Sequence, residues 1–512
     1  MKIPNHRTIL IVFLFLLTSN LFSQPKPEFR GVWIASVDNI DWPLKGMTNP
    51  DSQRVEFIRQ LDMHKSNGMN AVIVQVRPAA DAFYPSQLEP WSQWLTGVQG
   101  QPPSPYYDPL EFMIKETHKR GMEFHAWCNP YRAEFAIGKS SIAANHITRT
   151  HPEWFFTYGN TRYFDPGNKE GRQFVVNVIR DIVSRYDIDA IHFDDYFYPY
   201  RIAGKEFPDD ASYQQSGNGL SREDWRRSNT DSIIFALSKA IKEEKKHVRF
   251  GISPFGVWRN NSKDSLGSPT HAGLTNYDDL YADILLWLRE GWIDYVAPQL
   301  YWEFEHSVVP FGVLLDWWSK HSYGKHCYIG LGIYKAGTNA AWRDKTQLPR
   351  MITDIRKMTG VEGAIYFSSK SFEKNPNGWN DSLQRNYYKS PATVPPMPWL
   401  DSTVVEKPVV SVTIGASNGI GTTLSIQNLD TLQKLRAFIV YAFDKSDTVR
   451  STASGRNILR VIPATTNRVD YLVLQQDLSR QFAVSSLNTE NNESEPVFLP
   501  LFNPAIANKS SE

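Results

Sequence analysis

Only two cysteines, Cys128 and Cys327, occur in the 512 residues of the chain. So few cysteines exclude a scaffold held together by disulfides, and both the paired and the unpaired state of these two stay open. A surplus of one charge is also missing, because 55 Lys and Arg residues balance 54 Asp and Glu residues. A nearly neutral chain has no electrostatic signal for nucleic acid, so we expect no nucleic-acid partner.

Motifs typical of metal and phosphate sites are missing as well. No CxxC or HExxH pattern occurs, so the sequence indicates no metal site and no cofactor. No Gly-rich phosphate loop occurs, which counts against a doubly wound nucleotide-binding fold. Aromatic residues, in contrast, make up 13% of the chain. Aromatic faces stack on the apolar faces of sugar rings, although large cores explain the same composition equally well.

The N-terminus carries a short apolar run. Lys2 and Arg7 precede "TILIVFLFLLTSNLFSQ", which is too short to span a bilayer comfortably. A basic start, a short apolar region and small residues around Ser23 are typical of a signal peptide. We therefore predict a leader over residues 1–23 and an exported protein, periplasmic or extracellular, with no membrane span after cleavage. An uncleaved anchor is the alternative.

Four segments share one pattern, in which a glycine ends a helical stretch and a short apolar strand follows. These glycines are Gly68, Gly121, Gly291 and Gly360, and glycine suits the left-handed residue that ends a helix. Counting all such units predicts eight strands, near residues 30–37, 71–77, 123–129, 189–195, 249–255, 295–301, 327–332 and 363–368. Helical patterns lie between them, and one opens with the capping-box spacing of Ser221 and Asp224.

Strands that alternate with helices predict a parallel sheet. Eight repeats with short loops at one end and long loops at the other are typical of a (β/α)8 TIM barrel, which we place at residues 28–390. A Pro-rich linker follows at 391–408. Residues 409–503 then form short alternating segments between turn residues, which predict a small all-β sandwich domain.

Alternate side chains of a barrel strand face inward, while the others meet the helices. The inward side chains predicted near the carboxyl ends of the strands are Gln75, Arg77, His125, Trp127, Asn129, His192, Asp194, Ser253, Phe255, Gln299, Tyr301, Tyr366 and Ser368. One polar residue inside a barrel is most simply a hydrogen-bonded structural group. Several on independent strands indicate a site, because barrel interiors are normally filled by branched apolar residues.

The segment "IHFDDYFYPY" at 191–200 contains two adjacent acids. Glycoside hydrolysis needs two carboxyl groups that flank the scissile bond, and Asp194 is the first candidate because it faces inward. Neighbours on a strand diverge, so we expect the second acid on another strand and favour Glu303, just past the sixth. Asp195 is the main rival, and Asp81 on the long second loop is a weaker one.

Each assignment has a structural alternative. Asp195 can cap the following loop or pair with an arginine, and Glu303 can be a solvated loop acid. The expected substrate-binding residues are Arg77, Asp81, His125, Trp127, Asn129, Tyr131, His192, Tyr196, Trp258, Gln299 and Tyr301. Other aromatics that serve either as sugar platforms or as loop packing are Trp42, Trp91 and Trp94.

Six segments, in this order, resemble the glycosyl-hydrolase-like family 10 proteins. They are "EFRGVWIASVDNIDWP" (28–43), "NAVIVQVRPAADAFYPSQLEPWSQWLTG" (70–97), "FHAWCNPYR" (124–132), "YFDPGN" (163–168), "IHFDDYFYP" (191–199) and "ISPFGVWRN" (252–260). The resemblance implies an exported bacterial protein with a TIM-barrel glycoside hydrolase fold, often followed by a fibronectin-type-III-like domain, which residues 409–503 resemble. It implies extracellular polysaccharide or cell-wall glycan as substrate and assigns no catalytic role to any residue.

The leading hypothesis is an exported glycoside hydrolase that cleaves a polysaccharide or a peptidoglycan glycan strand by two-carboxylate acid/base chemistry. One alternative is a non-catalytic glycan-binding envelope protein that kept the barrel and its aromatic platforms. A purely structural envelope protein is a third possibility, and the polar residues that gather at one barrel end argue against it.

Overall fold

The computed structural model describes residues 24–413, 422–430, 434–447, 450–464 and 466–501. The leader predicted at residues 1–23 therefore lies outside the described residues. The chain forms two compact units. Phe29–Gln384 and Trp399–Asp401 make up the first, and residues 24–28, Arg385–Pro398 and the described residues from Ser402 onward make up the second.

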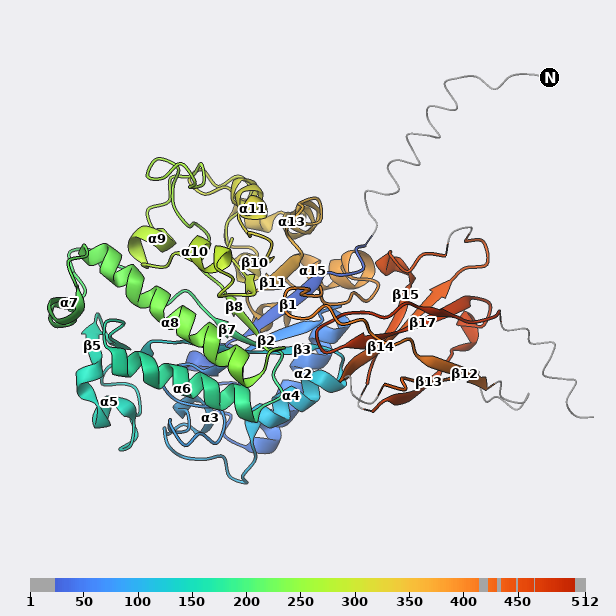
Figure 1. The fold of residues 1–512 in the computed structure, drawn as a ribbon, viewed down its shortest axis with the longest axis horizontal. Coiled ribbons are helices and arrows are strands. Elements are labelled where there is room, and N and C mark those ends of the chain that lie inside the picture. Colours follow the sequence, from blue (N-terminus) through green and yellow to red (C-terminus); the bar gives the residue numbers. More distant parts are fainter. Residues whose placement is uncertain (1–23, 414–421, 431–433, 448–449, 465, 502–512) are drawn as a thin grey trace, which may run out of the picture. The chain divides into compact units, whose positions relative to one another are not determined.

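Eight parallel strands close into a barrel in the first unit (Figure 1). In their hydrogen-bonded order they are β1 (Phe29–Ile34), β11 (Gly363–Tyr366), β10 (His326–Leu331), β9 (Tyr295–Val296), β8 (Arg249–Ile252), β7 (Ala190–Phe193), β3 (Glu123–Cys128) and β2 (Ala71–Arg77). The predicted TIM barrel is confirmed, and all eight predicted strands exist. Most end earlier than predicted, as β9 does at Val296 instead of residue 301.

A helix follows each barrel strand. The helices that follow the strands in chain order are α2 (Pro50–Ser66), α4 (Pro109–Lys119), α6 (Lys169–Arg185), α8 (Arg222–Glu244), α10 (Ile284–Arg289), α11 (Phe311–Lys320), α13 (Gln347–Ile355) and α15 (Trp379–Ser382). Further helices in the loops are α3 (Gln93–Thr96), α5 (Ile147–Thr150), α7 (Asp210–Ser216), α9 (Asn276–Asp279), α12 (Ala340–Arg343) and α14 (Ser369–Phe372). Within the described part of the chain, no helix has the length and apolarity needed to cross a membrane.

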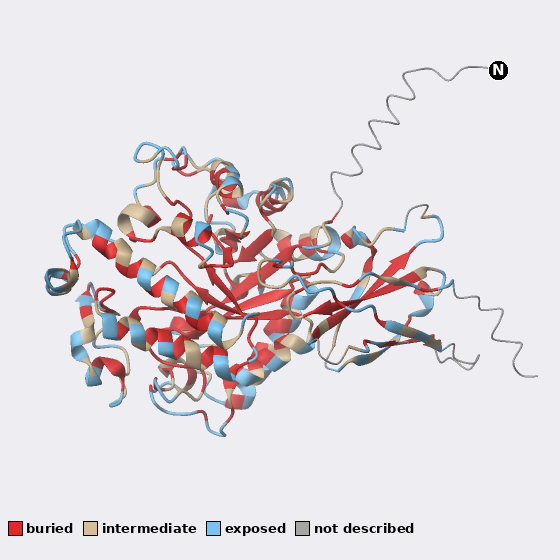
Figure 2. Ribbon diagram, viewed as in Figure 1, coloured by how far each residue is buried: buried red, intermediate tan, exposed pale blue. Residues whose placement is uncertain are grey.

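The local signals at the helix ends behave as predicted. Ser221 caps α8, because its side chain accepts a hydrogen bond from the backbone N–H of Asp224. The four glycines that the repeated units predicted all have positive φ, between 65° and 83°. Figure 2 shows that the barrel strands are buried throughout and that the long helices bury one face only.

A small antiparallel sheet is inserted between β3 and α6. Its strands lie in the order β4 (Arg132–Glu134), β6 (Thr161–Phe164) and β5 (Phe155–Tyr158). Because β4 begins only four residues after β3 ends, the insertion starts at the carboxyl end of the barrel strands. It therefore adds side chains to the end of the barrel where a TIM barrel carries its site.

The second unit contains two antiparallel sheets in its described part. One has the order β12 (Val409–Thr413), β13 (Thr423–Gln427), β16 (Arg468–Leu472), and the other β15 (Ile458–Pro463), β14 (Leu435–Phe443), β17 (Gln481–Asn488), β18 (Val497–Phe498). Leu424 and Ile426 of the first sheet share a core with Phe438 and Phe482 of the second. The predicted all-β sandwich is confirmed, whereas the fibronectin-type-III-like assignment and the limits of the linker stay predictions.

Candidate active site

A pocket of about 290 Å³ lies at the carboxyl ends of the barrel strands. Its lining residues are Trp33, Ala35, Val37, Ile40, Gln75, Trp127, Arg132, Asp194, Asp195, Tyr196, Ser253, Gln299, Tyr301, Tyr334 and Phe367. Aromatic rings form much of the wall, and a few polar groups converge between them. This combination is typical of a small-molecule site and suits a sugar ring.

Asp194 lies directly after β7, where two side chains hold its carboxylate. Trp127 Nε1 donates to Oδ2 at 3.1 Å, and Asn129 Nδ2 donates to both oxygens at 3.0 and 3.1 Å. The Asn129 amide has a fixed orientation, because its Oδ1 accepts the backbone N–H of Arg132 at 2.7 Å. Burial raises the pKa of Asp194, and the charge of Arg132 and these hydrogen bonds oppose the shift. The donors thus hold Asp194 in one orientation and favour its ionised form.

Asp195 has a different environment. Burial and the neighbouring charge of Asp194 raise the pKa of Asp195 to about 7, against hydrogen bonds from Tyr200 and Gln299. The Tyr200 hydroxyl donates to Asp195 Oδ2. An acid with a pKa near neutrality suits general acid catalysis, so the two neighbouring carboxyls differ in the role that each can play.

Both acids line the same pocket, which corrects the expectation that they diverge. The strand predicted to reach residue 195 ends at Phe193, so both acids stand in the loop that follows, where strand alternation no longer applies. Glu303, the expected partner of Asp194, is not among the residues that line the pocket. Its Oε2 accepts a hydrogen bond from Trp342 Nε1 at 2.9 Å. The structure therefore brings Asp194 together with Asp195 and not with Glu303.

Gln75 presents an unpaired donor at the pocket. Its Oε1 accepts the backbone N–H groups of Ser36 and Val37 at 3.2 and 2.9 Å, so a flipped amide would lose both bonds. Its Nε2 is buried and has no hydrogen-bond partner among the described residues. Because Gln75 also lines the pocket, this donor is a candidate contact for a ligand oxygen.

Arg132 brings a guanidinium group to the pocket from the inserted strand β4. Its guanidinium carbon lies 4.9 Å from the ring centre of Tyr196 and 5.6 Å from that of Phe135. Burial raises the pKa of Asp194, and the positive charge of Arg132 opposes that rise. Strand alternation missed Arg132 because the residue belongs to an insertion beyond the end of β3.

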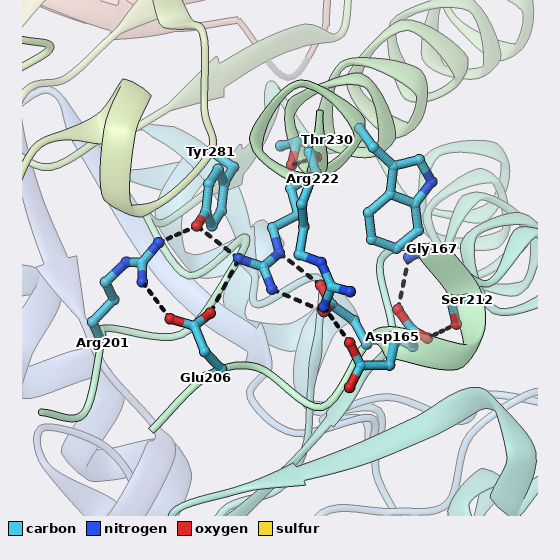
Figure 3. Close-up of polar contacts among 12 residues, drawn as sticks. Asp165, Gly167, Arg201, Glu206, Ser212, Arg222, Thr230 and Tyr281 are labelled. Carbon is cyan, nitrogen blue, oxygen red and sulfur yellow. Dashed lines mark hydrogen bonds and ion pairs between the residues drawn. The ribbon is translucent and has the colours of Figure 1, made fainter. Parts of the chain in front are cut away.

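A charged cluster anchors the loop between β7 and α8, which carries Tyr196. Arg226 Nε pairs with Asp209 Oδ2 at 2.7 Å, and both side chains are buried. Arg226 and Arg201 both donate to the Tyr281 hydroxyl. Figure 3 shows this cluster with the additional contacts of Asp165, Gly167, Glu206, Ser212 and Arg222. The cluster holds the loop in place within the protein, so the pocket wall at Tyr196 is preorganised.

His125 and His192 lie inside the barrel in a continuous chain of hydrogen bonds. Trp33 Nε1 donates to His192 Nε2 at 3.2 Å, so the proton of His192 is on Nδ1 and points to Tyr295 Oη at 2.9 Å. The Tyr295 hydroxyl is then free to donate to His125 Nδ1 at 2.9 Å, and His125 Nε2 donates to Glu123 at 3.0 Å. Burial lowers the pKa of His192 well below its ordinary value, in agreement with a neutral ring.

Neither histidine lines the pocket, and both ring nitrogens of each are paired within the protein. The substrate-binding role predicted for His125 and His192 therefore has no support in their positions. They are structural groups of the barrel interior.

Arg77 is fully buried and pairs with Glu89. Its Nε donates to both carboxylate oxygens at 3.0 and 2.8 Å, and its Nη1 donates to the carbonyl oxygen of Asn129 at 2.5 Å. Arg77 thus fixes the turn that presents Asn129 to Asp194. It acts as a positioning residue and does not line the pocket as a substrate contact.

Asn129, also predicted as a substrate contact, holds Asp194 and does not line the pocket. Three more predicted substrate contacts lie outside the pocket lining. Asp81 accepts a hydrogen bond from Gln99 Nε2 at 3.2 Å, and burial raises the pKa of Asp81 to about 7. Tyr131 is fully buried. Trp258 is buried and donates to Asp283 Oδ1 at 3.3 Å. All three are parts of the packed loops.

The predicted site residues that do line the pocket are Asp194, Asp195, Trp127, Tyr196, Gln299 and Tyr301. Residues that line it without having been predicted as catalytic or substrate contacts include Trp33, Gln75, Arg132, Ser253, Tyr334 and Phe367. The sequence could have indicated Gln75 and Ser253, because both occupy positions that were predicted to face inward. Alternation along the eighth strand predicted Tyr366 and Ser368 as the inward residues. Because β11 ends at Tyr366, alternation does not extend beyond it, and Phe367 lines the pocket instead.

The two cysteines give no second candidate site. Cys128 and Cys327 are buried and unpaired, and burial raises the pKa of both thiols, so neither supplies a thiolate at neutral pH. In the part of the chain that the structure describes, no group of three His, Cys, Asp or Glu side chains is arranged to hold a metal ion.

Residues 28–347 match the family described as Glycosyl hydrolase-like 10. Glycosyl hydrolase YngK of Bacillus subtilis (strain 168) is 45% identical over 481 residues, which are 92% of this chain and 93% of the relative. Glycosyl hydrolase DigH of Escherichia coli (strain K12) is 37% identical over 367 residues, which are 68% of this chain and 82% of the relative.

Among solved structures, the PgaB (BpsB) glycoside hydrolase domain from Bordetella bronchiseptica aligns with a TM-score of 0.42 and 14% identity, over 70% of this chain and 98% of that one. This likeness is too distant to add to the assignment, which depends on the family match and the two relatives. The chain belongs to the glycosyl hydrolase-like 10 family.

Proposed function

We propose that the protein is an exported glycoside hydrolase that cleaves a polysaccharide or a peptidoglycan glycan strand, with Asp194 and Asp195 as its reactive groups. The observation that carries this proposal is the pair of unlike carboxyls in one aromatic-walled pocket. Asp194 is held by N–H donors, and the pKa of Asp195 is raised to about 7. Membership of a glycosyl hydrolase-like family supports the reaction class.

We infer different roles for the two acids. Asp195 is the general acid, which protonates the glycosidic oxygen so that the leaving group departs as an alcohol. Asp194 is the fixed carboxylate, which stabilises the positive charge that develops on the sugar. The aromatic walls stack on the ring, and Gln75 Nε2 donates to one of its oxygens.

Export is the part of the proposal that depends on the sequence of residues 1–23 alone. We expect the mature protein to begin just after Ser23. Fractionation of the producing cells, followed by N-terminal sequencing of the purified protein, tests this point. A full-length protein that stays with the membrane fraction would instead indicate an uncleaved anchor.

A digestion screen tests the enzymatic part. Wild type, Asp194→Asn, Asp195→Asn and Glu303→Gln are incubated with peptidoglycan glycan strands and with a panel of bacterial polysaccharides, and products are identified by mass spectrometry. We expect wild type and Glu303→Gln to release the same products, and each pocket variant to be slower by about 10²–10⁴-fold.

The same screen separates hydrolysis from binding. Calorimetric titration of each glycan into wild type and Asp194→Asn measures affinity independently of turnover. A glycan that the wild type binds, with no product from any glycan, would identify a non-catalytic glycan-binding protein. Equal rates for wild type and Asp194→Asn would place the reaction elsewhere in the molecule.

A further inference from the structure

The two carboxyls of the pocket come from adjacent residues, and this restricts how they reach a sugar. Both follow β7 at one strand end. In the common mechanisms two carboxyls flank the scissile bond, about 5–5.5 Å or about 6.5–9.5 Å apart, and the second acts on the anomeric carbon directly or through water. No other acid is among the residues that line this pocket, so none from another strand faces the pair.

Asp194 is also unsuited to be the nucleophile. Both of its oxygens accept hydrogen bonds from side-chain N–H groups, of Trp127 and Asn129, at 3.0–3.1 Å. Donors of this kind stabilise the negative charge and oppose the rise in the pKa of Asp194 that burial causes, and they occupy both carboxylate oxygens. A carboxylate held this way is better suited to accept one more hydrogen bond and to stabilise a nearby positive charge.

We propose that the substrate supplies its own nucleophile: the sugar in the pocket carries a 2-acetamido group, trans to the leaving group, whose carbonyl oxygen attacks the anomeric carbon. This inference rests on the proposed function and names its substrate class. Asp194 accepts a hydrogen bond from the acetamido N–H, and Asp195 is the general acid and base. Hydrolysis assisted by the substrate in this way is an established exception to the two-carboxylate mechanism.

In the first step Asp195 gives its proton to the glycosidic oxygen. The bond from the anomeric carbon to that oxygen breaks with its electron pair on the leaving alcohol, and the acetamido oxygen bonds to the anomeric carbon. The product is a bicyclic oxazolinium ion whose positive charge Asp194 stabilises. In the second step the Asp195 carboxylate takes a proton from water, whose oxygen attacks the anomeric carbon. The bicycle opens, Asp195 is protonated again, one water is consumed and the configuration is retained.

The rest of the pocket fits this ligand. Trp33, Tyr301 and Phe367 provide apolar surface of the kind that a methyl group needs. Gln75 Nε2, which has no partner within the described part of the chain, adds a buried donor for a sugar or amide oxygen. The pocket therefore offers an acceptor for the acetamido N–H, a donor for an oxygen and apolar walls for the methyl group.

Binding of a stable intermediate mimic tests the inference without turnover. The probe is the thiazoline derived from N-acetylglucosamine, in which sulfur replaces the oxazoline oxygen, titrated into the full chain by calorimetry. We expect the wild type to bind it at least about 100-fold more tightly than N-acetylglucosamine. Asp194→Asn should weaken thiazoline binding about 50-fold, since a hydrogen bond to a charged group is lost. Glu303→Gln, outside the pocket, should change it less than about twofold.

Each outcome is informative about a different claim. If the wild type binds the thiazoline no more tightly than N-acetylglucosamine, the inference is overturned whether or not any glycan is cleaved, and this comparison needs no variant. Tight binding that depends on Asp194, without cleavage of any glycan, supports the 2-acetamido ligand and overturns the proposed function instead.

A second readout uses a glycan that the wild type cleaves. Replacing its acetyl groups by trifluoroacetyl groups makes the amide oxygen a weaker nucleophile, so we expect kcat to fall at least about tenfold. NMR of the first product should show retained configuration at the anomeric carbon. An unchanged kcat, an inverted product or a covalent sugar ester on Asp194 would overturn the inference and leave the hydrolase proposal in place.

Discussion

Two groups of buried polar residues share the barrel, and they differ in whether the protein satisfies them. In the interior, His192, Tyr295 and His125 pass hydrogen bonds from one to the next, and every ring nitrogen is paired. In the pocket, Gln75 Nε2 has no hydrogen-bond partner among the described residues, and the pKa of Asp195 is raised to about 7. Buried polarity alone therefore does not locate a barrel site; here the site is the pocket that Gln75 and Asp195 line together.

The largest expected effect is the loss of activity when an acid of the pocket is replaced. Asp195→Asn should lower kcat/KM by about 10²–10⁴-fold on an unactivated glycan, because the leaving oxygen loses its proton donor. Initial rates on the glycan identified by the digestion screen measure this effect. Glu303→Gln is the matched control and should keep kcat/KM within about twofold. Activity within tenfold of wild type for Asp195→Asn would refute the role of Asp195.

In the interior, the corresponding change should affect stability and not chemistry. Arg249 pairs with Glu123 at the end of the histidine chain, and both are buried. Arg249→Met leaves the Glu123 charge without this partner and should lower the free energy of unfolding by about 3–5 kcal/mol. Denaturant unfolding measures the loss. We expect kcat/KM per folded molecule to change less than about threefold. A stable Arg249→Met protein without activity would contradict the account that interior polar residues support stability while pocket residues support catalysis.

Asp195 should also destabilise the fold at high pH. Its native pKa, about 7, lies above the value of 3.8 for a free side chain, so the folded protein binds this proton more tightly. Stability from this group is lost as the pH rises from about 4 to about 7. Asp195→Asn should therefore be more stable than wild type by about 2–4 kcal/mol at about pH 8, and nearly equal at about pH 4. Unfolding curves at both pH values check the sign. A variant less stable than wild type at about pH 8 would contradict the assigned environment.

The smallest effect concerns the free donor. Gln75→Met should lower kcat/KM about 3–10-fold through a higher KM, the size expected for one hydrogen bond to a neutral oxygen. Because Ser36 and Val37 also lose their acceptor, the rates are normalised to folded protein. If KM and kcat/KM are both unchanged, Gln75 does not contact the substrate.

The sequence predicted the barrel well and part of the lining of the candidate pocket. Units such as the one around Gly68 contain both a helix stop and the next strand, so local chemistry determined the order of elements. Strand alternation tells which way a side chain faces but not its depth along the barrel. His192 and Asp194 both face inward, yet only Asp194 reaches the pocket, while His192 lies in the interior chain.

The remaining errors have two physical causes. Alternation fails where a strand stops, and the stop after Phe193 placed Asp195 in the pocket beside Asp194. Insertions add residues that no barrel periodicity covers, and Arg132 on β4 is the example. Strand ends in the barrel depend on contacts between strands far apart in the chain, which a single sequence does not display.

The dependence of kcat/KM on pH tests the central claim most directly. For the wild type we expect activity to fall above about pH 7, as Asp195 loses its proton, and to fall again in acid, where Asp194 becomes protonated. On a glycoside whose leaving group needs no proton, Asp195→Asn should retain activity and lose the fall above about pH 7. A fall near pH 7 that persists in Asp195→Asn would contradict the assignment of Asp195 as the general acid.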